Sequence, residues 1–159
     1  MSLPTGVLGR FDVDPRLNPA EVEWLRAYAA SPVFPTSGDP YAVAMNPRAS
    51  PVDSRATDGS MESHCDWQPC VDGCCLLWAH DRETAGPGVD PQYLIDHFLR
   101  PGAHAAASGR DDFRLFTFDH QISGIVAAED SETRRLYLLV ADGHVVEEHA
   151  LVPGDPFPW

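Results

Sequence analysis

The strongest constraint on the fold is an apolar run, Leu136–Val140, followed by a tight-turn signal at Asp142-Gly143. A strand with one solvent face alternates apolar and polar residues, so an uninterrupted run predicts an inner strand covered on both faces. An Asp-Gly pair beside apolar residues is a strong hairpin signal and predicts a partner strand over 144–152. Segments 113–118 and 122–128 predict two further strands. The last third of the chain should therefore be an antiparallel meander.

Two short helices are predicted upstream of this meander. Asn18 can cap a helix, Pro19 suits its first turn, and Glu21 stands where the acid of a capping box belongs. Pro32 should end that helix. The segment 93–99 places apolar residues four apart, as one face of a second helix requires.

Two other segments complete the predicted sheet. Residues 7–13 alternate apolar and other side chains, as a half-buried strand does. Residues 66–70 and 74–78 surround an Asp72-Gly73 turn and predict a hairpin. The resulting order of strands and helices predicts an α+β fold, in which a mostly antiparallel sheet carries two short helices packed on one face.

The chain of 159 residues is long enough for one core, so residues 1–159 are expected to form a single domain. Residues 31–63 are rich in proline and serine and show no periodicity. They predict either an irregular flap over a functional surface or a disordered insertion. The proline-rich tail at 153–159 cannot form a helix or a central strand.

The net charge of −13 limits the partners. Nucleic acids and anionic membranes attract clustered cations, so neither is an expected partner. A basic protein partner, mimicry of a nucleic acid, or an acidity that only maintains solubility remain as alternatives. All 11 basic residues are arginine, which excludes Schiff-base chemistry through a lysine. The start of the chain lacks the features of a signal peptide, so a cytoplasmic location is expected.

All four cysteines lie between Cys65 and Cys75. Thiolates and imidazoles suit zinc and other soft metals, which makes Cys65, Cys70, Cys74 and His64 candidate ligands. The spacing differs from that of zinc knuckles, and Cys74 and Cys75 should point to opposite faces of one strand. We therefore favour no metal and expect no cofactor, with the thiols acting as small apolar residues of a hairpin. A disulfide between Cys70 and Cys74 would be disfavoured in the cytoplasm.

Two histidines are candidates for acid–base catalysis. His120 could be a general base, but its neighbour Asp119 should face the opposite way on a strand, so another carboxylate would have to orient the ring. His97, beside Asp96 in the second helix, offers a second pair of this kind. The alternative in each case is a polar group with no catalytic role.

Four aromatic residues are candidates for lining an apolar ligand pocket: Trp67, Trp78, Tyr93 and Phe98. At this spacing, such side chains more often form an ordinary core. The sequence has no phosphate-binding loop, dinucleotide fingerprint, nucleophile elbow or zinc-protease motif, which argues against the common functions of those classes.

Three motifs belong to a likeness that covers most of the chain except residues 31–63 and the tail. They are Trp67-Gln-Pro-Cys-Val-Asp72-Gly73-Cys-Cys-Leu76-Leu-Trp78, then Tyr93-Leu-Ile-Asp-His-Phe-Leu-Arg-Pro101, and finally Gly124-Ile-Val126 with Leu136-Tyr-Leu-Leu-Val140 and Asp142-Gly-His-Val-Val146. With them the chain resembles a family of small actinobacterial and phage-encoded α+β proteins. No activity is established for that family, so the resemblance implies a fold and no site residue. The cysteines and the stretch 79–89 depart from its pattern.

These observations favour a small acidic binding or interaction protein that holds a protein or a small ligand beneath residues 31–63. The phage resemblance also allows a role in host interference. The alternative is a small cofactor-independent enzyme, such as a cyclase, isomerase or hydrolase, with a His/Asp acid–base pair. Such an enzyme would need an enclosed apolar pocket containing a carboxylate–imidazole contact.

Overall fold

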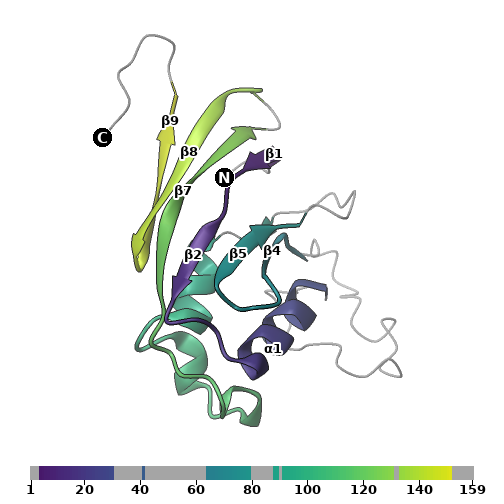
Figure 1. Ribbon diagram of the computed structural model, residues 1–159, viewed down its shortest axis with the longest axis vertical. Coiled ribbons are helices and arrows are strands. Elements are labelled where there is room, and N and C mark those ends of the chain that lie inside the picture. The colour runs from purple at the N-terminus through teal and green to yellow at the C-terminus, as the bar shows by residue number, and fades with distance from the viewer. Residues whose placement is uncertain are drawn as a thin grey trace, which may run out of the picture.

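The structure, a computed structural model, describes residues 4–30, 41, 64–79, 88–89, 91–130 and 133–151. A mostly antiparallel sheet and two helices form its body (Figure 1), which confirms the predicted α+β class. Apart from Tyr41, the segment expected to be a flap lies outside the described residues, as does the tail at 153–159.

Seven strands form the main sheet, and each pair of neighbours in it is antiparallel. Six lie in the order β4-β5-β2-β7-β8-β9, and β1 pairs with the end of β7. The strands are β1 (Pro4–Leu8), β2 (Phe11–Asp14), β4 (Trp67–Pro69), β5 (Cys75–Trp78), β7 (Gln121–Asp130), β8 (Leu136–Gly143) and β9 (Val145–Ala150). A separate parallel pair consists of β3 (His64–Cys65) and β6 (Gly88–Val89).

Both predicted hairpins are present. The strands β4 and β5 place Trp67 opposite Trp78 across the Asp72-Gly73 turn. The strands β8 and β9 meet at the predicted Asp142-Gly143 turn. The apolar run forms most of β8, an inner strand between β7 and β9, and its central residues Tyr137–Leu139 are all buried.

The helices lie together at one end of the sheet (Figure 1). Helix α1 spans Pro19–Ala30 and begins at the predicted cap. Helix α2 (Pro91–Leu94) continues as a π-helical segment, η1 (Ile95–Leu99), and together they form the second predicted helix. Two 3₁₀ segments follow, η2 (His104–Ala107) and η3 (Asp111–Phe113).

The prediction of a strand over 113–118 is wrong. Phe113 ends η3, and the chain continues in a tight turn in which the Phe116 amide donates to the Phe113 carbonyl at 3.1 Å. The turn lets the rings of Phe113 and Phe116 both pack on Trp24, with centroid distances of 4.8 and 5.8 Å. An extended strand would have put residues three apart on opposite faces.

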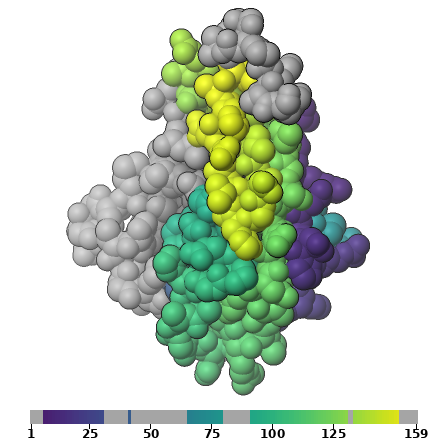
Figure 2. Space-filling model, turned by 90° about the vertical axis from the view of Figure 1, so that its left-hand side faces the viewer, coloured from purple at the N-terminus to yellow at the C-terminus, as the bar shows by residue number. Residues whose placement is uncertain are grey.

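The edge strand β9 is held at its start by one side chain of α2. Gln92 donates to the His144 carbonyl at 2.9 Å and accepts from the Val146 amide at 2.7 Å. Figure 2, in which β9 is yellow, shows the strand running over the surface next to the segment that contains α2. The last hairpin is thereby joined to the helical end of the molecule.

The prediction of a single strand over 7–13 is also wrong, because this segment forms parts of two strands, β1 and β2. Both halves pair with β7, Leu8 opposite Ala127 and Asp12 opposite Ser123. The break lies at Gly9 and Arg10. Gly9, with a φ of 117°, packs on Ile125 and Val126 of β7, and Gly124 of β7, with a φ of 137°, packs on Arg10 and Phe11. Only glycine adopts such angles without strain, so the two glycines allow the two backbones to cross closely.

Gly124→Ala should lower the free energy of unfolding by about 1–2 kcal/mol, because alanine is strained at the φ of 137° that Gly124 adopts. An added Cβ would also lie only 2.9 Å from the Arg10 carbonyl oxygen. Chemical unfolding followed by circular dichroism measures the loss. Gly6→Ala is the matched control, since a Cβ there meets no atom within 4 Å. Equal stability of the two variants would contradict the strained crossing.

Candidate functional site

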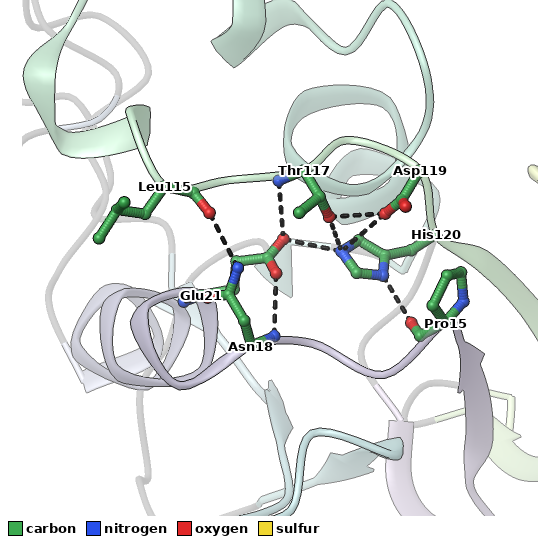
Figure 3. A network of polar contacts seen from close by, with 7 residues as sticks. All are labelled: Pro15, Asn18, Glu21, Leu115, Thr117, Asp119 and His120. Carbon is green, nitrogen blue, oxygen red and sulfur yellow. Dashed lines mark hydrogen bonds and ion pairs between the residues drawn. The ribbon is translucent and has the colours of Figure 1, made fainter.

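A buried ion pair joins the first turn of α1 to the residue before β7 (Figure 3). The Glu21 Oε2 and His120 Nε2 atoms are 2.7 Å apart, and each side chain is only 1% exposed. They are the two buried polar or charged residues of the described core. Groups of this kind are buried only when they are paired, so the contact is a specific feature of the fold.

Glu21 also closes the predicted capping box. Its Oε1 accepts from the Asn18 amide at 2.9 Å, and the Asn18 side chain accepts from the Glu21 amide at 2.9 Å. One carboxylate oxygen therefore satisfies the helix start while the other binds His120. The sequence predicted the first role, and the second was missed because the two residues are 99 positions apart.

The other groups around His120 fix its protonation. Its Nδ1 donates to the Pro15 carbonyl at 2.6 Å, because a carbonyl can only accept. With the Glu21 carboxylate accepting at Nε2, both ring nitrogens carry hydrogen. Burial opposes this charge, but the hydrogen bonds to Glu21 and Pro15 and the charges of Glu21 and Asp119 raise the pKa of His120 above its ordinary value.

Asp119 is linked to His120 through Thr117 and by a longer direct contact. The Thr117 hydroxyl donates to Asp119 at 2.6 Å and lies 3.1 Å from His120 Nε2, while Asp119 Oδ1 is 3.7 Å from that nitrogen. The Asp119 side chain is 55% exposed. Glu21, rather than Asp119, is therefore the carboxylate that orients the ring.

The second candidate pair, His97 and Asp96, is not joined in this way. Asp96 Oδ1 accepts from Arg100 at 3.0 Å and from Gln92 at 3.1 Å. His97 instead shares a hydrogen bond of 2.6 Å with the Tyr41 hydroxyl. Burial, followed by the neighbouring His104, lowers the pKa of His97 to about 4. The ring is therefore neutral at physiological pH.

The four aromatic candidates lie in or against the main core. Phe98 is fully buried, and its ring centroid is 5.0 Å from that of Trp24 and 5.1 Å from that of Tyr28. Trp67 is buried, and its ring centroid is 5.1 Å from that of Phe11. The ring of Tyr93 stacks on that of His97, with their centroids 3.8 Å apart. Trp78 is partly buried and packs against the same core. Their contacts are those of interior packing between the helices and the sheet.

Three of the four cysteines gather at the β4–β5 turn. The sulfur atoms of Cys70, Cys74 and Cys75 all lie within 4.8 Å of one another, and those of Cys70 and Cys74 are 3.4 Å apart. The expectation that Cys74 and Cys75 face opposite ways is wrong, because β5 begins only at Cys75 and Cys74 belongs to the turn. Strand alternation therefore does not apply to this pair.

The remaining metal candidates do not join this group. Cys65 is buried, and its thiol donates to the Trp67 carbonyl at 3.0 Å. The side chain of His64 lies outside the described residues. The described cysteines are all free thiols.

The thiols of the turn differ in acidity. Burial raises the pKa of Cys70, but hydrogen bonds from Cys75 and Cys74 outweigh it and lower the pKa to about 6. Burial and the neighbouring Cys70 raise the pKa of Cys75 to about 12. The contacts within the turn therefore favour the thiolate form of Cys70 and the protonated form of Cys75.

The sheet face turned away from the core carries an apolar surface, which we call the outer patch: Leu8, Ile125, Leu136 and Val145. These side chains are 79%, 49%, 55% and 55% exposed. Strand register places them on one face, with Leu8 opposite Ala127, Ile125 opposite Val140, and Val145 opposite Asp142. The apolar run Leu136–Val140 was predicted to be buried on both faces of the sheet. Its first residue, Leu136, is instead exposed to solvent on the outer face.

No family model, curated protein or solved structure is significantly similar to this chain. Within the described ranges, no helix is long and apolar enough to cross a membrane.

Proposed function

We propose that this chain is a binding protein that docks a basic, partly apolar segment of a partner protein on the outer patch. The observation that carries the proposal is the exposure of four large apolar side chains on one face of the sheet. The solvent face of an antiparallel sheet normally carries polar residues. Exposed apolar surfaces rimmed by polar groups are typical of protein-interaction sites.

The charge around the patch supports a basic partner. Asp142 lies directly opposite Val145, and Glu147 lies opposite Val140 on the same face. Two basic groups near this face already have acidic partners, His149 with Glu147 at 3.3 Å and Arg134 with Glu129 at 2.8 Å. The chain as a whole carries a net charge of −13. A partner with arginine or lysine flanking apolar residues would match both features.

The buried ion pair supports binding in preference to catalysis. An acid–base enzyme needs a carboxylate–imidazole contact that a substrate can reach. Glu21 and His120 make such a contact, but each is 1% exposed and both histidine nitrogens are engaged. This enclosure favours a structural role for the pair. In a phage-related setting, the docked segment would belong to a basic host protein.

A synthetic peptide of alternating arginine and valine is the probe for this proposal. We expect it to bind by fluorescence anisotropy and to perturb the amide resonances of β1, β7, β8 and β9 in NMR spectra. Leu136→Ser should weaken binding roughly tenfold, because an apolar anchor of about 1–2 kcal/mol is lost. Asp142→Asn should weaken binding and reduce its salt dependence.

The matched controls lie away from the outer patch. Leu115 is 60% exposed, close to the 55% of Leu136, so Leu115→Ser removes a similar apolar surface. Asp111 is an exposed carboxylate in η3, which makes Asp111→Asn the control for charge. Resonance shifts scattered over the acidic surface, or equal effects of Leu115→Ser and Leu136→Ser, would refute docking at the patch.

A further inference from the structure

We propose that the β4–β5 turn is a binding site for a soft, zinc-type metal ion, with the sulfur atoms of Cys70, Cys74 and Cys75 as ligands. Their mutual distances, all within 4.8 Å, allow one ion to contact all three. Zinc–sulfur bonds are about 2.3 Å long, so the sulfurs of one tetrahedral ion lie about 3.8 Å apart. The 3.4 Å between the Cys70 and Cys74 sulfurs lies below that spacing, and the 4.8 Å limit on all three pairs lies above it. This site is independent of the outer patch.

The turn is already held in a fixed shape by its backbone. The Cys70 amide donates to the Cys75 carbonyl and the Gly73 amide to the Cys70 carbonyl, both at 3.0 Å. These two bonds close the loop that carries the three thiols. Because the ligands start on one rigid turn, an ion would not have to order a flexible segment.

Contacts with the preceding chain anchor the same turn to the fold. The Val13 amide donates to the Cys74 carbonyl at 2.9 Å, and the Leu17 amide donates to the Gly73 carbonyl at 3.0 Å. Gly73 has a φ of +72°, and a Cβ there would collide with the Leu17 carbonyl oxygen. The turn therefore packs directly against the segment between β2 and α1.

The exposure of the ligands gives an ion a way in. Cys70 and Cys74 are partly exposed, whereas Cys75 is buried. Three thiolates are soft ligands that select zinc-type ions over magnesium or calcium. Within the described residues the group has three members, so a tetrahedral ion would need a fourth ligand from outside this group.

Titration of the fully reduced full-length protein with Zn²⁺ tests this site. We expect one ion per chain with a Kd below about 1 µM, weaker than a four-ligand structural site. With Cd²⁺ as the probe, the thiolate-to-metal charge-transfer band should have the intensity of three thiolates per ion. Magnesium should not compete.

Single substitutions identify the ligands. Cys70→Ser and Cys74→Ser, at partly exposed positions, should each weaken Zn²⁺ binding roughly 100-fold or more and reduce the Cd²⁺ band to two thiolates. Cys65→Ser is the matched control, because its hydroxyl can still donate to the Trp67 carbonyl, and it should bind like the parent. Absence of Zn²⁺ binding, or an equal loss in Cys65→Ser and Cys70→Ser, would overturn the assignment.

Discussion

Glu21→Ala should lower the free energy of unfolding by about 3–5 kcal/mol, the range for removing one partner of a buried ion pair. The substitution leaves His120 enclosed, with its Nε2 atom facing the space that the carboxylate filled. It also removes the acceptor for the Asn18 amide at the start of α1. Urea unfolding, followed by circular dichroism below the ordinary histidine pKa of about 6.5, measures the loss while His120 is charged.

Two other variants separate the contributions of this residue. Glu23 is exposed on the same helix, so Glu23→Ala should change stability by less than about 0.5 kcal/mol. Glu21→Gln keeps an oxygen for the Asn18 amide but removes the charge next to His120, so its loss should be intermediate. If Glu21→Ala lost only the value of a helix cap, about 1 kcal/mol, the buried pair would contribute nothing.

The pair connects parts of the chain that no other described ion pair connects. It joins α1 to the segment before β7, where the His120 amide also donates to the Leu99 carbonyl at 3.1 Å. Asn18 extends the link by donating from its side chain to the Leu115 carbonyl at 2.8 Å. The network therefore holds α1, η1 and the start of β7 in a fixed relation. The network thereby fixes the helices against the core face of the sheet. The opposite face carries the outer patch.

Local signals in the sequence predicted the elements of this region but not their pairing. The Asn18–Glu21 spacing identified the capping box, because both groups lie within one helical turn. His120 was expected to need a carboxylate other than Asp119, yet periodicity carries no information on contacts between distant segments. Only the folded chain brings Glu21 to it.

Two of the errors in the strand predictions have a common cause. An extended backbone was expected at Cys74 and through 113–118, but in both places a tight turn replaces it. At the first site this turn gathers the three thiols, and at the second it packs Phe113 and Phe116 against Trp24. Apolar patterns show which residues are buried more reliably than they show where an extended segment begins.

Raising the pH should remove the stabilisation that His120 provides. The folded state holds the proton of His120 more tightly than the unfolded state does, because its pKa is raised in the fold. Its contribution is therefore complete below the unfolded pKa of about 6.5 and is lost as the pH rises through the folded pKa. The loss should be on the order of 1.5–3 kcal/mol, the value of a buried hydrogen bond to a charged group.

Comparison of the parent with His120→Gln isolates this effect from other titrating groups. His97, with its pKa lowered to about 4, reduces stability only as the pH falls below about 6.5. Cys70, with its pKa lowered to about 6, adds stability as the pH rises, so both proteins should carry Cys70→Ser. The stability difference between them, from urea unfolding at each pH, should then shrink as the pH rises above about 6.5. A constant difference would mean that His120 is neutral in the folded protein, with its bare Nε2 accepting from a protonated Glu21 carboxyl.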